Sequence, residues 1–447
     1  MIIQPVDLGM LSLNKVFRQV CILGNHPFWL DSGDSGVLEG EGLWAMGAAP
    51  RKVFNSAETP GKDPFSLLSD LRNALPSWEG EPTLQAIPMG IFGFSYEAGA
   101  AAIPIPVPPD DPMGIPAFFG AAYSAVLVGV HGESGAFICA DSAEACRGME
   151  EVLGRDIQPG EPPFFSVRGA LWPDRDLEEY VEGVERVLGY IEAGDIYQAN
   201  IARRFEGSVL AGSDPIVLFE RLRETSSAPF GAYVDLGTKQ ILSASPECLL
   251  RWDGNGNVSS FPIKGTAGRK ESAEEDKAAT RRLSEDPKEN AEHIMIVDLV
   301  RNDLGRVAEY GTVSVPEPMK VQSFPNVHHL VSRVSGRLAE GRTEEDLWKA
   351  VFPGGSITGA PKIRACEIIA EIEVAQRGIY CGAIGFLDPR GGGCANIPIR
   401  TGVVSGERVF FHVGGGIVSD SSPEREAAET EVKARGWRRA LSEEEFR

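Results

Sequence analysis

The chain has 447 residues, and its 64 acidic side chains against 43 basic ones give a formal net charge of −21 at pH 7. Such a charge repels phosphate backbones and anionic lipid surfaces, which argues against a nucleic-acid-binding or membrane-surface protein. The length exceeds the usual size of one hydrophobic core, so the chain can bury a large active site.

The spacing of the cysteines and the length of the apolar segments indicate the cellular compartment in which the protein is expected. The seven cysteines form no C-x-x-C pair and lack the dense, even spacing of a disulfide framework. Residues 1–17 show no basic segment followed by an apolar one, and the longest apolar stretch, 121–130, is too short to cross a bilayer. We therefore expect a cytoplasmic protein with reduced thiols and no membrane partner.

The first part of the chain is predicted to be rich in short strands. Apolar runs between Gly, Pro and Asp turns indicate strands over 27–33, 91–97 and 121–130. Prolines and glycines recur over 154–173, which is typical of a connection between lobes. We therefore place a boundary near residue 170, between an N-terminal β-rich subdomain, 1–170, and a second domain, 171–440.

The second part mixes helices and strands. Apolar residues at helical spacing predict a helix from Asp174 to Gly194. Further elements are expected as strands over 197–206, 230–236, 240–251 and 258–264, a charged helical region over 272–307, strands over 379–388, 394–404 and 408–418, and a last helix over 423–440. Because turns join most consecutive strands, we expect an α+β fold, a large and mainly antiparallel β-sandwich with helices packed outside.

One lysine stands out in this acidic chain. Residues 261–269 read FPIKGTAGR, which places Lys264 between a strand-like run and a Gly-Thr turn. An amine held against apolar residues loses its proton more easily than a solvated one and can act as a nucleophile. The alternative is an ordinary surface lysine that enters a turn.

Two predicted helices begin with the same arrangement of acidic residues. Each starts at a capping residue followed by proline, at Asp286 and at Ser422. Each then carries a Glu-x-x-Glu pair on one helix face: Glu289 with Glu292, and Glu426 with Glu429. Four carboxylates on two facing helices suit Mg²⁺. Alternatively, each pair only complements the dipole of its own helix.

Other segments offer polar groups to an anion. The run HVGGGIVSD at 412–420 follows a strand and can present backbone amides, although glycine turns of this kind are common. Arg400 lies in an otherwise apolar strand and should meet a carboxylate, either from the protein or from a ligand. His329 is either a hydrogen-bonded core histidine or a catalytic one. The stretch 353–369 does not match the P-loop pattern, which argues against nucleotide triphosphate binding.

Seven segments, taken together, resemble the chorismate-utilising enzymes. In that family's order they are GDIYQANIARRF at 194–205, SASPECLL at 243–250, PIKGTAGR at 262–269, DPKENAEHIMIVDLVRNDLGRV at 286–307, the stretch 353–369, RGIYCGAIGF at 377–386 and the run 412–434. The resemblance extends over about residues 175–435, with a weaker N-terminal echo of anthranilate synthase component I. It implies a sandwich fold in which Mg²⁺ bridges the protein to the ring carboxylate of chorismate.

The same resemblance implies roles for individual residues. The implied Mg²⁺ site consists of Glu292 and Glu429 as ligands, with Glu289 and Glu426 supporting them through water. The implied contacts of the pyruvyl carboxylate are Arg400, Tyr380 and the amides of Gly414, Gly415 and Gly416. Ser356 and His329 are implied to lie beside the ring.

Three positions indicate the branch of the family. Where isochorismate-forming and salicylate-forming members carry a lysine that activates water, this chain has Gln198, which cannot act as a base at neutral pH. Where anthranilate synthases carry alanine in P-I-A-G-T, it has Lys264. The aminodeoxychorismate synthases, which make the precursor of p-aminobenzoate for folate synthesis, share that lysine. Asn200 also resembles this branch.

The mechanism that the resemblance implies is a double displacement. Lys264 attacks C2 of chorismate while the C4 hydroxyl leaves, with Glu247 as general acid. Ammonia then attacks C4 and displaces the lysine, which gives 4-amino-4-deoxychorismate without loss of pyruvate. The segment around Cys381 has the wrong spacing for a class I glutaminase elbow. A separate glutamine amidotransferase subunit is therefore the expected partner.

Two alternatives stay open at this point. The nearest is anthranilate synthase component I, a lyase that adds ammonia at C2 and expels pyruvate. The other is a catalytically silent metabolite-binding subunit. In addition, FWLDS at 28–32 resembles the segment where relatives bind tryptophan, which predicts a tryptophan site near Asp31 and Ser32.

Overall fold

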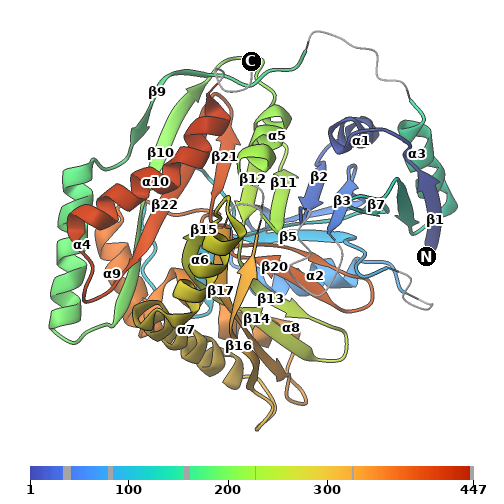
Figure 1. The fold of residues 1–447 in the computed structure, drawn as a ribbon. Helices are drawn as coiled ribbons and strands as arrows, with labels where there is room; N and C mark the ends of the chain where they lie inside the picture. Colours follow the sequence, from blue (N-terminus) through green and yellow to red (C-terminus); the bar gives the residue numbers. More distant parts are fainter. Residues whose placement is uncertain (34–41, 79–83, 156–161, 227, 325–326, 443–447) are drawn as a thin grey trace.

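Two antiparallel β-sheets lie against each other, and helices cover both outer surfaces (Figure 1). The computed structural model describes residues 1–33, 42–78, 84–155, 162–226, 228–324 and 327–442. The expected α+β sandwich is confirmed. Across the part of the chain so described, no helix has both the length and the apolar character that crossing a bilayer requires.

The first sheet has 12 strands within the described residues. In spatial order they are β1 (Ile2–Asp7), β8 (Gly135–Ala140), β7 (Ala125–Val130), β3 (Leu43–Gly47), β2 (Phe28–Asp31), β11 (Phe230–Asp235), β12 (Lys239–Ser245), β21 (Thr401–Ser405), β22 (Arg408–Ile417), β10 (Gln198–Val209) and β18 (Gly359–Ala360), with β9 (Val167–Pro173) also beside β10. β2 pairs with β11, so strands from both sides of residue 170 form one continuous sheet.

The second sheet has ten strands among the residues described. In spatial order they are β15 (Ile263–Gly268), β17 (Val327–Arg337), β14 (Asn257–Phe261), β13 (Cys248–Trp252), β20 (Gly393–Asn396), β19 (Ala383–Leu387), β5 (Gly90–Phe94), β6 (Phe118–Ala122) and β4 (Lys52–Asn55), with β16 (Ser314–Ser323) also beside β17. Here β5 pairs with β19. The division into 1–170 and 171–440 stays a prediction, and both sheets draw strands from both parts.

Alternation along the strands creates separate cores on the two faces of the first sheet. Successive side chains of a strand point to opposite faces. Phe28 of β2 therefore joins the core between the sheets, whereas Trp29 joins the core under the outer helices. Phe410 and Phe411 of β22 divide in the same way. This two-residue period binds the sheet to its partner on one side and to helices on the other.

The outer helices bury apolar stripes against the sheets. The first sheet carries α1 (Leu13–Val20), α3 (Ala143–Leu153), α5 (Pro215–Thr225) and α10 (Pro423–Leu441), with α4 (Leu177–Glu192) and α9 (Lys362–Ile372) next to β10. The second sheet carries α2 (Pro64–Asn73), α6 (Ala273–Glu285), α7 (Pro287–Gly305) and α8 (Glu344–Val351). Short 3₁₀ turns are η1 (Cys21–Leu23), η2 (Ser56–Glu58), η3 (Tyr96–Ala101) and η4 (Gly355–Ile357). In α4, Tyr180, Val184 and Val187 follow helical spacing and are buried, as the sequence predicts.

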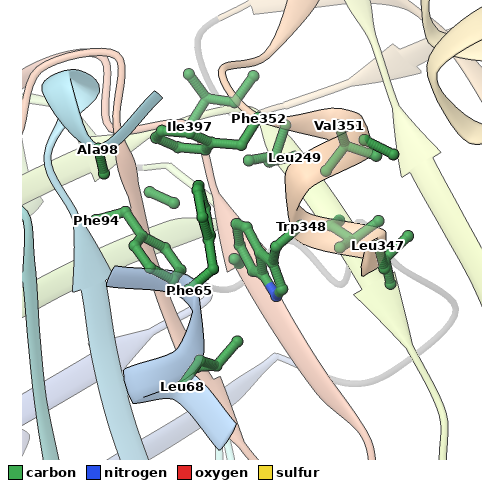
Figure 2. Packing of buried hydrophobic residues seen from close by; sticks show 14 of the residues in the cluster. Phe65, Leu68, Phe94, Ala98, Leu249, Leu347, Trp348, Val351, Phe352 and Ile397 are labelled. Atoms are coloured by element: carbon green, nitrogen blue, oxygen red, sulfur yellow. The ribbon is translucent and has the colours of Figure 1, made fainter. Parts of the chain in front are cut away.

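Aromatic rings fix α2 and α8 against the second sheet (Figure 2). Ring centroids lie 4.9 Å apart between Phe65 of α2 and Phe94 of β5, and 5.0 Å apart between Phe94 and Trp348 of α8. Leu249 of β13 belongs to the same cluster. Such rings contribute large apolar areas and defined edge contacts. Because β13 begins directly after Glu247, this core fixes the strand that leads away from that carboxyl group.

Three expected strands are each divided in two by a proline. The run 240–251 forms β12 and β13 around Pro246, 258–264 forms β14 and β15 around Pro262, and 394–404 forms β20 and β21 around Pro398. Proline has no N–H to donate to a ladder and ends pairing within a sheet. Single strands over these ranges were therefore wrong predictions.

Other boundaries differ from the expected ones for local reasons. The expected strand 121–130 covers the end of β6 and all of β7, and the expected strand 91–97 ends at Phe94, before η3. The helical region 272–307 divides into α6 and α7 at Pro287. The expected connection 154–173 ends in β9, which pairs with β10, while 156–161 lies outside the described residues.

Candidate active site

Lys264 lies in β15, at the edge of the second sheet. The register of β15 against β17 shifts between Lys264 and Thr266, and Gly265 between them has φ +75°. The predicted Gly-Thr turn is therefore a bulge inside a strand. Glycine adopts this φ without strain, and a Cβ here would lie 3.1 Å from Oε2 of Glu289. The bulge thus brings the strand close to α7.

The amine of Lys264 points across to the glycine strand of the first sheet. A Cβ added to Gly416 would lie 3.2 Å from its Nζ and 2.7 Å from Nε2 of Gln198. Burial lowers the pKa of Lys264, against the opposing charges of Glu292 and Glu247. The side chain keeps some accessible surface, which fits an amine that borders a cleft. Its amine forms no ion pair with any residue that the structure describes.

Gln198 begins β10 and is completely buried. Neither its amide nitrogen nor its amide oxygen has a hydrogen-bond partner among the described residues. A buried amide without partners is costly, and native proteins keep few of them. The unsatisfied amide next to Lys264 is therefore a position where a polar ligand can bind.

Glu247 lies between β12 and β13 and is buried. Burial raises its pKa to about 7, against a hydrogen bond from Ser356, the charge of Lys264 and the backbone N–H of Ile263. Its Oε1 has no hydrogen-bond partner in the described chain. Ser356 is itself buried in η4. Glu247 can thus hold a proton near neutral pH and deliver it next to the lysine.

The two acidic pairs lie at the first turns of α7 and α10, as predicted. Burial raises the pKa of Glu289, and the charge of Glu292 adds to the rise. Burial also raises the pKa of Glu426 against a 2.7 Å hydrogen bond from Ser421, and Glu429 adds to that rise. The electrostatic repulsion within each pair is the kind that a bound cation relieves.

The predicted caps of these helices differ. Asp286 accepts hydrogen bonds from the amides of Lys288 and Glu289 at 2.9 and 3.2 Å, which confirms its capping role. Ser422 precedes α10 but caps no amide, because its hydroxyl instead donates to Glu424 at 2.9 Å. The prediction that Ser422 caps the helix was wrong.

Two lysines already neutralise part of this acidic region. Lys433 Nζ lies 2.8 Å from Oε1 of Glu429 and donates to the carbonyl of Gly414 at 2.7 Å. Lys288 pairs with Asp420 at 3.0 Å. Among the described residues, no three His, Cys, Asp or Glu side chains converge closely enough to hold a metal ion. The sequence analysis missed Lys433, although its position four residues after Glu429 on a helix was a signal for the pair.

The glycine run lies within β22 and not in a turn after a strand. Gly414 and Gly416 stand opposite Ala202 and Asn200 of β10, whose own amides donate elsewhere, to Glu373 and Thr358. These two pairs are therefore the non-hydrogen-bonded type. The amides of Gly414 and Gly416 consequently point away from β10.

On that side of β22 the neighbouring strand β21 has already ended, since its last pair is Gly402 with Phe411. Two of the three predicted glycine amides thus point to an open strand edge. Gly415 stands opposite Ile201 in the alternate, hydrogen-bonded position and is committed to the sheet. The strand edge thus keeps the amides of Gly414 and Gly416 available as donors, and their contact with a ligand stays a prediction.

Arg400 is not in a strand. It lies between β20 and β21 with φ +52° and is exposed. Burial lowers the pKa of the Arg400 guanidinium, and this side chain forms no ion pair within the described residues. Of the two options from the sequence, a protein carboxylate is absent from the described contacts, so the option of a ligand carboxylate remains.

Tyr380 and His329 are both buried. The ring of Tyr380 stacks on His412 with centroids 5.0 Å apart. His329 shares Nδ1 with Thr266 Oγ1 at 3.1 Å and the carbonyl of Gly265 at 3.2 Å. Its Nε2 has no partner in the described structure, and burial lowers its pKa to about 4. It is therefore neutral at pH 7, with one nitrogen bonded inside the protein and one available.

A buried histidine that the sequence analysis did not single out supports α7. His293 Nε2 lies 2.6 Å from Ser332 Oγ, and that hydroxyl also accepts the amide of Met319 at 2.8 Å. This contact ties the helix, one residue after Glu292, to β17. Nothing in the sequence pattern distinguished His293 from an ordinary helix residue.

Asp31 and Ser32 line a cavity of about 350 Å³ between the two sheets. Trp44 and Phe230 from the first sheet and Cys394 from the second are also in its wall. Burial alone raises the pKa of Asp31, but hydrogen bonding from His131 and the charge of Arg223 hold it below its usual value. The Asp31 carboxylate is thus already paired inside the protein.

Comparison with known proteins agrees with this geometry. The chorismate binding enzyme family matches residues 26–439, and the chain belongs to that family. The chain is similar to aminodeoxychorismate synthase component 1 of Escherichia coli, with 36% identity over 83% of this chain and 81% of that protein. It is also 45% identical to anthranilate synthase component 1 of Thermus thermophilus over 61% of this chain and 59% of that protein.

A solved structure supports the fold. Anthranilate synthase component I from Streptococcus pneumoniae superposes with a TM-score of 0.78 and 31% identity, over 90% of this chain and 93% of that one. Three curated relatives that are 43–45% identical are matched over only 55–59% of their own length. Relatives of both activities match, so similarity alone does not choose between the two reactions.

Proposed function

We propose that this protein converts chorismate and ammonia to 4-amino-4-deoxychorismate, the reaction of aminodeoxychorismate synthase component I. One observation carries the proposal. A lysine amine with a lowered pKa, and with no ion pair in the described residues, lies within electrostatic range of Glu292 and Glu247 and near an unsatisfied buried amide, that of Gln198. This arrangement supports a covalent role for Lys264.

In the first step the neutral amine of Lys264 forms a bond to C2 of chorismate. The two ring double bonds shift, and the bond between C4 and its hydroxyl breaks. Glu247 supplies the proton, so the hydroxyl leaves as water. The lowered pKa of Lys264 favours the free amine, and the pKa of about 7 at Glu247 keeps the acid partly protonated near neutrality.

In the second step ammonia attacks C4, the double bonds return, and the bond between C2 and the lysine nitrogen breaks. The lysine nitrogen leaves as the neutral amine with both of its hydrogens, and the Glu247 carboxylate takes the proton that the new C4 ammonium group releases, which restores the acid. The net change replaces hydroxyl by amine and releases water. Gln198 is no base, so water at its position stays a poor nucleophile and ammonia is favoured.

The substrate's two carboxylates need separate partners in this acidic protein. Arg400 and the strand-edge amides of Gly414 and Gly416 offer charge and hydrogen bonds to the pyruvyl carboxylate, with Tyr380 beside them. His329 offers a neutral imidazole nitrogen to the ring region. These donors are the kind that a small dianion requires.

The chemistry of the donor set fits Mg²⁺. Glu289, Glu292, Glu426 and Glu429 are hard oxygen ligands, and burial, with a smaller contribution from the other carboxylate of each pair, raises the pKa values of Glu289 and Glu426. Each helix contributes one pair, and because no three of the described carboxylates converge on one point, water and a substrate carboxylate would have to complete the shell. When bound, the ion neutralises charge on the ring carboxylate and polarises the ring. Glu292 and Glu429 are proposed to hold it, with Glu289 and Glu426 acting through water.

Two further parts of the proposal concern partners. A separate glutamine amidotransferase subunit is proposed to supply ammonia, because no glutaminase elbow occurs around Cys381. Tryptophan is proposed for the 350 Å³ cavity that Asp31 and Ser32 line, since apolar and aromatic side chains form much of its wall.

A product assay separates the proposal from anthranilate synthase activity. Chorismate, Mg²⁺ and an ammonium salt are incubated with the protein alone, and the products are identified by mass spectrometry. We expect 4-amino-4-deoxychorismate, which yields p-aminobenzoate only after a separate lyase is added. Fluorescent anthranilate formed by the protein alone contradicts the proposal. No consumption of chorismate at any ammonium concentration favours a silent binding subunit.

A further inference from the structure

Two cysteines of neighbouring strands bring their sulfur atoms together in the second sheet. Cys248 opens β13 and Cys394 lies in β20, and the two strands pair with a register shift between them. Their Sγ atoms are 3.9 Å apart. A disulfide bond is about 2 Å long, so closure requires the sulfurs to approach by roughly that distance again. All seven cysteines are reduced in the structure.

Access to this pair differs sharply between its members. Cys248 is buried, whereas Cys394 is only half-buried and lies in the wall of the 350 Å³ cavity between the sheets. The cavity wall also contains Asp253 and Gly254, which are exposed, so the cavity opens at the surface. A small polar oxidant can therefore reach Cys394 when no tryptophan occupies the cavity, while Cys248 stays protected behind it.

The pKa values of the two thiols shift in opposite directions, and the more accessible Cys394 has the lowered one. A hydrogen bond from Cys248 and the charge of Arg251 lower the pKa of Cys394 against the effect of burial. Burial raises the pKa of Cys248. The thiolate is the reactive form of cysteine. An accessible, more acidic thiol with a second thiol in contact is the usual arrangement of an attacking and a resolving cysteine.

We propose that Cys394 and Cys248 form a peroxide-reactive pair that closes reversibly to a disulfide. The Cys394 thiolate attacks one oxygen of hydrogen peroxide, the O–O bond breaks, and a sulfenic acid and hydroxide form. The Cys248 sulfur then attacks the Cys394 sulfur and displaces the sulfenic oxygen as water. Two thiols are oxidised by two electrons, and the peroxide is reduced to two molecules of water.

Closure has a consequence for the neighbouring site, and this part depends on the proposed function. Cys248 directly follows Glu247, the proposed general acid. Drawing the Cys248 sulfur toward Cys394 pulls on the chain where Glu247 accepts its hydrogen bond from Ser356. A displacement of about 1 Å at a catalytic group can cost about 100-fold in rate. Oxidation is therefore expected to lower amination.

The experiment treats the full chain with hydrogen peroxide, alkylates the remaining thiols, and maps them by peptide mass spectrometry. Wild type is expected to lose two of its seven thiols and to regain both with dithiothreitol. Cys394→Ser should keep Cys248 reduced, and Cys248→Ser should leave a sulfenic acid at Cys394 that a dimedone probe traps. Cys21→Ser is the matched control, because Cys21 is the other half-buried cysteine and has a raised pKa.

The outcomes separate this proposal from the previous one. A Cys248–Cys394 disulfide in wild type and Cys21→Ser, but in neither serine variant of the pair, supports the thiol pair. A full complement of seven thiols after peroxide, or a link from Cys394 to any other cysteine, overturns it. If the disulfide forms but neither redox state aminates chorismate, the thiol pair stands and the proposed function fails.

Discussion

At the scale of single residues, one amine and one carboxyl group have their protonation set by burial. Lys264 is pushed toward its neutral form and Glu247 toward its protonated form. In water the same two groups would exchange a proton and form an ion pair. Burial thus shifts the lysine toward the form that a nucleophile needs and the glutamate toward the form that a general acid needs, which are the roles proposed for them.

Removing the Lys264 amine should remove the covalent step. In Lys264→Ala, amination of chorismate is expected to fall by on the order of 10³-fold or more, as when other enzymes lose their nucleophile. The rate of chorismate loss and the mass of trapped protein adducts provide the measurement. Lys270→Ala, an exposed lysine close by in the sequence, is the matched control and should keep wild-type activity. Undiminished amination by Lys264→Ala contradicts a covalent role.

Glu247 should give the reaction an alkaline limit. Because the protonated form donates, activity is expected to be highest below its pKa and to fall as pH rises through about 7. Rates are measured across pH with free ammonia held constant. In Glu247→Gln, residual activity about 10²–10⁴-fold lower should lack this alkaline fall. If Glu247→Gln still loses activity at the same pH, the alkaline fall belongs to another group and not to Glu247.

At the scale of elements, two helices present equivalent acidic first turns from opposite sheets. Proline at the first helical position and the neighbouring Glu-x-x-Glu spacing recur in α7 and α10. α7 packs on β15 and β17 and α10 packs on β22 (Figure 1). The bulge at Gly265 and the bare strand at Gly415 allow both helices to approach closely. The metal site proposed here therefore depends on both sheets.

Loss of one carboxylate from either helix should weaken Mg²⁺ binding. Glu292→Gln and Glu429→Gln are each expected to raise the Mg²⁺ concentration for half-maximal activity by on the order of 10–100-fold, since even indirect partners of a metal contribute that much. Isothermal titration of Mg²⁺ and activity titrations provide the readouts. Glu424→Gln is the control, because Glu424 is an exposed first-turn glutamate of α10. Equal Mg²⁺ titrations in all variants would argue against the assignment.

Element positions followed from sequence wherever the periodic pattern was long. The helix around Tyr180 and the long strand that begins at Gln198 lie where the pattern indicates. The strand breaks at Pro246, Pro262 and Pro398 were missed because apolar residues continue through each proline. The missing N–H of proline was the available signal.

At the scale of the whole molecule, the candidate site exists only where the two sheets meet. Sequence motifs indicated Lys264, Glu247 and the four glutamates. No pattern could show that Gly416, more than 150 residues further along the chain, packs over Lys264. Likewise, whether the Gly414 amide faces an open edge depends on where β21 ends. Contacts between distant segments are decided by tertiary packing, which local propensity does not encode.

The isolated chain should depend on ammonia and ignore glutamine. With chorismate and Mg²⁺, an ammonium salt is expected to support amination. Glutamine in its place should give no aminated product above background. The release of glutamate and the formation of aminated product are both measured. The ammonium reaction in the same buffer is the positive control. Glutamine-dependent turnover by the protein alone would contradict a separate amidotransferase.

The interleaving of the two halves has a consequence for biosynthesis. β2 pairs with β11, which follows it by some 200 residues, and β5 pairs with β19, which follows it by nearly 300 residues. Until the ribosome has released those partners, β2 is paired only with β3 and β5 only with β6, so each early strand keeps one open edge, a situation that invites aggregation. Folding is thus dominated by distant pairings, which slow it. Exposure of these edges is therefore a hazard of synthesis that ends only when the distant strands pair.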